Sequence, residues 1–73
     1  MNLSQLKIGQ RATIESFTDS DMSLKLLEMG CIPGEEVELK LIAPLGCPIA
    51  ISVSGYILSM RKSEASSVIV SII

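Results

Sequence analysis

Short runs of alternating apolar and polar residues, separated by glycines and prolines, constrain the fold of this sequence most. The clearest run covers residues 35–42, where charged side chains separate Val37, Leu39 and Leu41. Successive side chains of a strand point to opposite faces, so this alternation predicts a half-buried strand. A second alternating run, 49–54, follows a loop that holds two prolines and a glycine. Two such runs around one short loop predict an antiparallel hairpin.

The rest of the chain predicts one helix, further strands and two short helical turns. In chain order, the sequence predicts a helical turn at 2–8, a strand at 10–17, a helix at 21–29, strands at 35–42, 49–54 and 56–61, a helical turn at 62–66 and a strand at 67–73. Five short strands at this spacing predict a mainly β fold, a small antiparallel barrel with one short helix after the first strand. Closing the sheet would protect its edges from pairing with other chains. The 73 residues allow a single domain, residues 1–73.

Turn signals and apolar spacing divide this chain into surface and core. Gly30 stands where the helix would end in left-handed geometry, the pair Pro33-Gly34 predicts a tight turn, and Gly55 interrupts the last hairpin. The predicted core consists of Leu24, Leu27, Val37, Leu39, Ile49, Ile51 and Leu58.

Composition excludes several functional classes. Six basic and eight acidic residues give a net charge of −2, whereas a phosphate-binding surface needs a basic excess, so no nucleic-acid partner is expected. Histidine, the commonest general base, is absent, and no nucleophile has a positioned partner, so the chain is not expected to be an enzyme. The sequence contains neither a signal peptide nor an apolar run long enough for direct membrane insertion. A cytoplasmic protein is therefore expected.

Two cysteines and a few carboxylates are the only candidate metal ligands. Cys31 and Cys47 lie sixteen positions apart, each beside a glycine in a predicted turn, and they form no CxxC motif. The paired carboxylates, such as Glu36 and Glu38, are expected to lie on the solvated face of a strand. No cofactor is expected beyond weak divalent-metal binding. The alternative function is a sensor or carrier that binds Fe²⁺ through both thiols and nearby carboxylates.

Several apolar side chains are not all expected to fit into so small a core. These are Met22, Met29, Ile32, Leu45 and Ile57. Contiguous exposed apolar groups mark protein-binding surfaces, and the lack of catalytic equipment favours an interaction module.

Four motifs in order resemble the ferrous iron transport protein A family, FeoA, over nearly the whole length. The motifs are Leu6-Lys7-Ile8-Gly9-Gln10, Leu26-Leu27-Glu28-Met29-Gly30-Cys31-Ile32-Pro33-Gly34, Ala43-Pro44-Leu45-Gly46-Cys47-Pro48 and Gly55-Tyr56-Ile57-Leu58-Ser59-Met60-Arg61. The sequence departs from the family at Cys47, where an aspartate is common. The resemblance implies an SH3-like barrel that accompanies the bacterial ferrous iron transporter FeoB, whose cytosolic part contains a GTPase domain.

From this resemblance we expect the chain to be a non-enzymatic regulatory protein. It would dock on the cytosolic part of FeoB, which would recruit it to the inner face of the membrane. The expected docking surface combines two loop segments, Leu45, Gly46 and Cys47 at the hairpin tip with Met29, Cys31 and Ile32 after the helix. If the chain activated the GTPase, Arg11 and Arg61 would be its only possible arginine fingers. Pairing of the last strand between copies would give a homo-oligomer.

Overall fold

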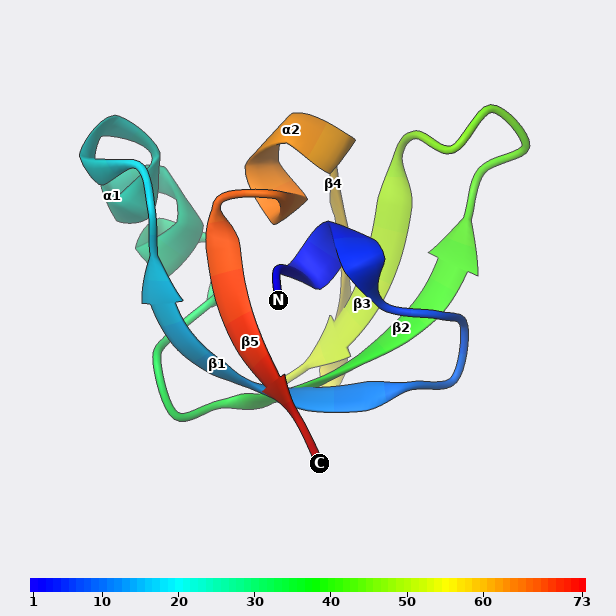
Figure 1. Cartoon of the computed structure of the whole chain (residues 1–73), viewed down its shortest axis with the longest axis horizontal. Coiled ribbons are helices and arrows are strands. Elements are labelled where there is room, and N and C mark those ends of the chain that lie inside the picture. Colours follow the sequence, from blue (N-terminus) through cyan, green and yellow to red (C-terminus); the bar gives the residue numbers. More distant parts are fainter.

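The computed structural model describes residues 1–73 and contains all five expected strands (Figure 1). The elements are η1 (Leu3–Gln5), β1 (Arg11–Phe17), α1 (Ser20–Glu28), β2 (Glu36–Ile42), β3 (Ile49–Val53), β4 (Tyr56–Met60), α2 (Lys62–Ala65) and β5 (Val68–Ile72). The strands form one antiparallel sheet in the order β4-β3-β2-β1-β5, which curls around the core. The predicted mainly β, five-stranded antiparallel fold is confirmed.

The core lies on the inner face of this curled sheet. Val37 of β2 stands between Ala12 of β1 and Val53 of β3, and each of the three is almost fully buried. The predicted core residues Val37, Leu39, Ile49 and Ile51 are buried, and Leu58 packs against them with part of its surface exposed. The alternation of the strands therefore places the interior correctly.

Helix α1 turns a different face to the core from the one its leucine spacing suggests. Leu24 and Leu27 are exposed, so their assignment to the core is wrong. Leu26 is completely buried instead, with Met22 and Met29 partly buried beside it. These three residues have the i, i+4, i+7 spacing of one helix face, which leaves Leu24 and Leu27 on the other side.

Because of a β-bulge in β2, the prediction that Leu41 faces inward is wrong. Leu39 pairs with Ile51, but Leu41 pairs with Ala50, so Lys40 is the extra residue between them. The extra residue reverses the alternation of side chains beyond it. Leu41 is therefore exposed, although the regular pattern of Val37, Leu39 and Leu41 predicts one inward face.

Strands β4 and β5 are the two ends of the sheet and do not pair, so the expected closure by strand pairing is wrong. Helix α1 bridges the opening, with the Lys25 ammonium 2.6 Å from Glu64 of α2 and the Tyr56 hydroxyl donating to the Met29 carbonyl. The N-terminus covers part of the edge of β5, where Val70 N–H donates to the Met1 carbonyl. Self-association through β5 stays a prediction.

Helix α1 ends in a turn that needs Gly30. Its N–H donates to the Leu27 carbonyl, and Cys31 N–H donates to the Leu26 carbonyl at 2.9 Å. This pair of bonds is a Schellman motif, in which the glycine adopts positive φ, here +102°. The apolar contact that accompanies the motif comes from Cys31 against Leu26, both completely buried. The chain therefore turns Cys31 inward and leaves Ile32 exposed.

Candidate interaction surface

The hairpin between β2 and β3 presents Leu45 to solvent on a well-braced loop. Gly46 N–H donates to the Ala43 carbonyl at 2.7 Å, and Ala43 N–H donates to the Pro48 carbonyl at 3.0 Å. With these bonds the loop fixes the tip, where Leu45 is 97% exposed. An apolar side chain so exposed contributes nothing to folding, so its position at the tip fits a contact with another molecule.

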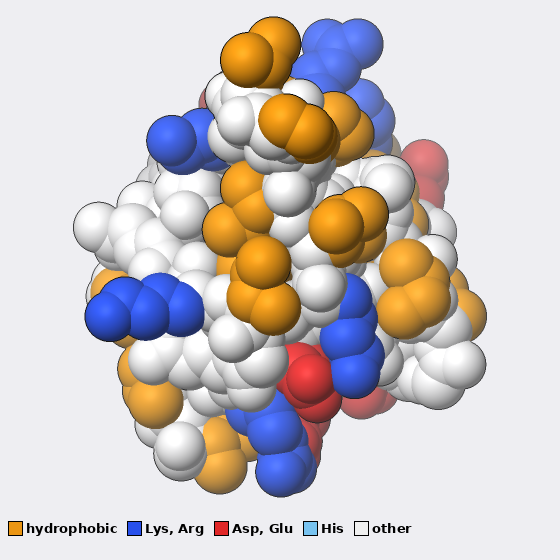
Figure 2. Space-filling view, turned by 90° about the vertical axis from the view of Figure 1, so that its right-hand side faces the viewer, with side chains coloured by type: hydrophobic (Ala, Val, Ile, Leu, Met, Phe, Trp, Pro, Cys, Tyr) orange, Lys and Arg blue, Asp and Glu red, His pale blue; other side chains and the backbone are white.

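Other exposed apolar side chains continue from this tip along the same end of the molecule. Gly9 N–H donates to the Leu39 carbonyl at 2.8 Å, which holds the loop before β1 against β2. We call the resulting patch the hairpin-end surface; it consists of Ile8, Leu41, Ile42 and Leu45. Figure 2 looks at this end and shows hydrophobic side chains along the middle of the face, with Lys and Arg side chains around them. Of these four residues, only Leu45 is expected from the sequence to lie on the docking surface.

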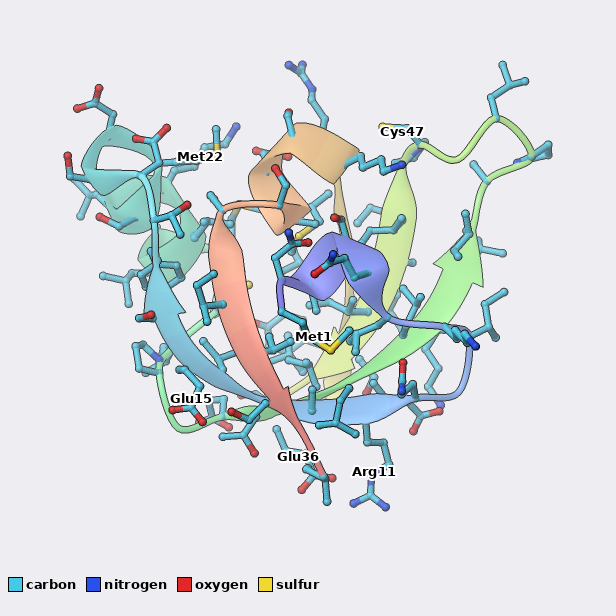
Figure 3. The ribbon with its side chains drawn as sticks, viewed as in Figure 1. Met1, Arg11, Glu15, Met22, Glu36 and Cys47 are labelled. Atoms are coloured by element: carbon cyan, nitrogen blue, oxygen red, sulfur yellow. The ribbon has the colours of Figure 1, made fainter.

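Cys47 lies beside this surface, as Figure 3 shows near the start of the hairpin's return strand. Its side chain is exposed, and Lys62 N–H donates to its Sγ atom at 3.3 Å. This bond joins the hairpin to the first turn of α2 and so brings Lys62 next to the tip. Gly46 and Cys47 therefore lie beside Leu45 at the hairpin-end surface, and their role in docking stays a prediction.

The second expected half of the surface does not join the first. Val53 and Tyr56 pair at one end of β3, next to Met29, whereas the hairpin tip precedes Ile49 at the other end. In Figure 1 the tip and α1 accordingly lie at opposite ends of the longest axis. Among Met29, Cys31 and Ile32, only Ile32 is well exposed, and Cys31 is completely buried. The structure thus separates the two segments that the sequence analysis combines.

The two thiols do not fit a shared metal site. Burial, and to a lesser extent the charge of Glu64, raises the pKa of the Cys31 thiol to about 11, so Cys31 is protonated at neutral pH when no metal is bound. A metal-binding cysteine must be a thiolate. Moreover, no group of three or more His, Cys, Asp or Glu side chains lies close enough together to hold a metal ion. Cys31 and Cys47 therefore do not form a shared metal site.

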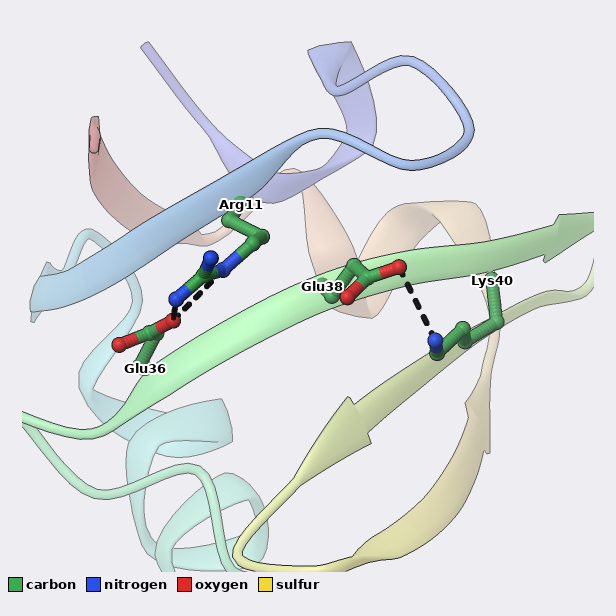
Figure 4. A network of polar contacts seen from close by, with 4 residues as sticks. All are labelled: Arg11, Glu36, Glu38 and Lys40. Atoms are coloured by element: carbon green, nitrogen blue, oxygen red, sulfur yellow. Dashed lines mark hydrogen bonds and ion pairs between the residues drawn. The ribbon is translucent and has the colours of Figure 1, made fainter.

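Half of the basic side chains are neutralised by carboxylates of the sheet and helices. Figure 4 shows two of these ion pairs on the outer face: Arg11 with Glu36, and Lys40 with Glu38 at 3.0 Å. The hydrogen bond from Arg11 Nε to Glu36 is 2.7 Å long, and this partner raises the pKa of the guanidinium. Arg11 is thus already engaged, whereas Arg61 makes no ion pair.

The third ion pair makes the stability of the fold depend on pH. The Glu64 side chain is buried, accepts from Lys25 and from Arg61 N–H, and its pKa is lowered, chiefly by Lys25. A lowered folded-state pKa stabilises the fold above the unfolded value, about 4.3, and this contribution disappears as pH falls through the folded value. We expect Glu64→Gln to lower the melting temperature at pH ~7, with a difference from wild type that shrinks in acid.

Thermal unfolding followed by circular dichroism from about pH 7 to about pH 3 tests this expectation. Glu28→Gln is the matched control, because Glu28 is exposed on α1 and makes no ion pair. A Glu64→Gln deficit that stays constant over the whole range would show that the carboxylate charge contributes nothing.

The molecule offers an outer surface rather than a cavity. The structure contains no pocket. None of its helices is long and apolar enough to cross a lipid bilayer.

Comparisons with known proteins agree on one family. The FeoA domain model matches residues 1–72. A FeoA-like protein from Clostridium acetobutylicum is 33% identical, with 99% of this chain and 85% of that chain covered and a TM-score of 0.92. The FeoA protein of Chlorobium tepidum is 36% identical, with coverages of 99% and 70% and a TM-score of 0.88. A comparison with curated protein sequences found no match.

A third solved structure supports the SH3-like description of the fold. Stenotrophomonas maltophilia FeoA complexed with zinc is 32% identical, with 97% of this chain and 89% of that chain covered and a TM-score of 0.81. It is described as a procaryotic SH3 domain protein, and a role as a bacterial ferrous iron transport activating factor is suggested for it.

Proposed function

Because this chain belongs to the FeoA domain family, which is associated with ferrous iron transport, we propose that it is a non-enzymatic accessory protein of ferrous iron uptake. It acts in the cytoplasm by binding the cytosolic GTPase region of the transporter FeoB. The suggested role of its Stenotrophomonas maltophilia relative as a transport activating factor supports the proposal.

The observation that carries the proposal is Leu45, an almost fully exposed leucine on a braced hairpin tip. Burying a leucine against a partner contributes about 1.5–3 kcal/mol of binding free energy. Little is lost in ordering this loop on binding, because its hydrogen bonds already hold its shape. Since the structure contains no pocket, we place the contact with the partner on this outer surface.

Binding through the tip predicts a strong effect of a charge at position 45. We expect Leu45→Glu to weaken binding to the cytosolic region of the transporter at least tenfold, because the contact would then bury a carboxylate. The measurement is isothermal titration of the wild type and the variant with the purified cytosolic region. The melting temperature should not change, because the side chain touches almost nothing in the fold.

The matched control is Ile57→Glu, which adds the same charge at another exposed position, on β4 away from the hairpin. It should bind as the wild type does. Equal binding by folded Leu45→Glu would remove the tip from the docking surface, whereas failure of the wild type to bind would refute the transporter partnership itself.

A further inference from the structure

The basic side chains that have no ion-pair partner all gather near the hairpin-end surface. Arg11, Lys25 and Lys40 each pair with a carboxylate, which leaves Lys7, Arg61 and Lys62 without one. Lys7 precedes Ile8 of the surface, and Lys62 N–H is bonded to Cys47 beside the tip. Figure 2 shows Lys and Arg side chains around a central run of hydrophobic ones, with some Asp and Glu side chains on the same face.

The carboxylates without ion pairs lie toward the other end of the molecule. They are Glu15, Asp19, Asp21, Glu28 and Glu35. Asp19, Asp21 and Glu28 belong to α1 or cap it, and α1 lies opposite the hairpin tip in Figure 1. Glu15 projects on the α1 side in Figure 3. A chain with a net charge of −2 therefore has a basic hairpin end.

We propose that the hairpin-end surface docks on an apolar hollow whose rim carries carboxylates on the partner protein. The inference rests on the proposed function in taking the partner to be a protein. Ile8, Leu41 and Leu45 enter the hollow, while Lys7 and Lys62 meet the acidic rim. Charged rims of this kind chiefly set orientation and association rate, and they make binding sensitive to salt.

An anionic lipid surface has related chemistry, so the choice of a protein rests on the proposed function. Screening limits either partner to groups within the Debye length, about 8–10 Å. The charged groups without an ion-pair partner near the hairpin end are basic, namely Lys7, Arg61 and Lys62, whereas the unpaired carboxylates lie toward α1. The vesicle experiment below distinguishes the two occupants.

The first experiment measures binding to the cytosolic region of the transporter at about 50 mM and about 300 mM salt. We expect Lys7→Gln and Lys62→Gln each to weaken binding about two- to fivefold at low salt and to reduce the salt dependence. Ser20→Glu is the matched control, because it changes the net charge by the same amount at the start of α1. It should leave the affinity unchanged. If all three variants bind alike, the acidic rim is refuted while the transporter partnership stands.

The second experiment needs no partner and uses two probes of equal length, octanoate and octylammonium. Amide shifts in ¹⁵N-labelled protein are expected at Ile8, Leu41 and Leu45 with octanoate, and near Leu24 and Leu27 with octylammonium. Octanoate shifts confined to α1, or absent from the hairpin end, would overturn the proposed chemistry whether or not the transporter binds.

Two further outcomes would assign the hairpin-end surface to a binding partner other than an acidic-rimmed protein hollow. Co-sedimentation of the wild type with anionic phosphatidylglycerol vesicles, lost in Lys7→Gln, would assign the surface to lipid instead. Concentration-dependent self-association that Leu45→Glu abolishes would assign it to the acidic, apolar α1 end of a second copy. The proposal predicts neither.

Discussion

Replacing Leu39 with alanine is expected to lower the free energy of unfolding by about 2–5 kcal/mol, the usual cost of a large-to-small change in a core. Leu39 is 1% exposed and pairs with buried Ile51 at the centre of the sheet. A domain of this length has about 4–11 kcal/mol of stability in total. Leu39→Ala should therefore lower the melting temperature by about 10 °C or more, or prevent folding.

Chemical denaturation of wild type and variant measures the loss, and Leu24→Ala is the matched control. Leu24 is 63% exposed on α1, so its truncation should change stability by less than about 0.5 kcal/mol. Equal losses in the two variants would contradict the assignment of core and surface. Should Leu39→Ala fail to fold, the milder Ile51→Val, expected to cost about 0.5–1.5 kcal/mol, provides the comparison.

The second large effect is expected at Gly30, where alanine should cost about 2–3 kcal/mol. The position has φ of +102°, which costs a non-glycine residue about 1–2 kcal/mol. A Cβ atom there would also lie 1.7 Å from the Tyr56 hydroxyl oxygen, so the tyrosine must move. That movement breaks its 2.8 Å hydrogen bond to the Met29 carbonyl, worth about 1 kcal/mol.

A double-mutant cycle with Tyr56→Phe separates the two causes. Tyr56→Phe removes the hydroxyl, so Gly30→Ala should cost less in that background than in the wild type. The expected remainder is the backbone term alone. Fully additive losses would show that the close approach of Gly30 and Tyr56 contributes nothing.

Alternation and turn residues predict most of the sheet, because both act over a few neighbouring residues. The pair Pro33-Gly34 lies in a turn where Glu35 N–H donates to the Ile32 carbonyl, and Gly55 lies with Ser54 in the β3–β4 turn, both at positive φ. Such turns are encoded by the residues that form them. Their prediction needs no knowledge of distant parts of the chain.

The candidate surface was harder to predict, because its members depend on tertiary arrangement. Leu41 faces outward only through the bulge at Lys40, and a bulge has no local signal in this alternating run. Cys31 is buried because the Schellman turn folds it onto Leu26. The distance between the hairpin tip and Met29 depends on the curling of the whole sheet. Only Leu45, at a tip set by local turn residues, could be found directly.

The most direct test of the account is a map of amide shifts on adding the transporter's cytosolic region to ¹⁵N-labelled protein. We expect the largest shifts at Ile8, Leu41 and Leu45 and around Lys62, with Leu24 and Leu27 on α1 unaffected. Shifts centred on α1, or no shifts at saturating partner, would contradict the claim that this small barrel works through its hairpin end.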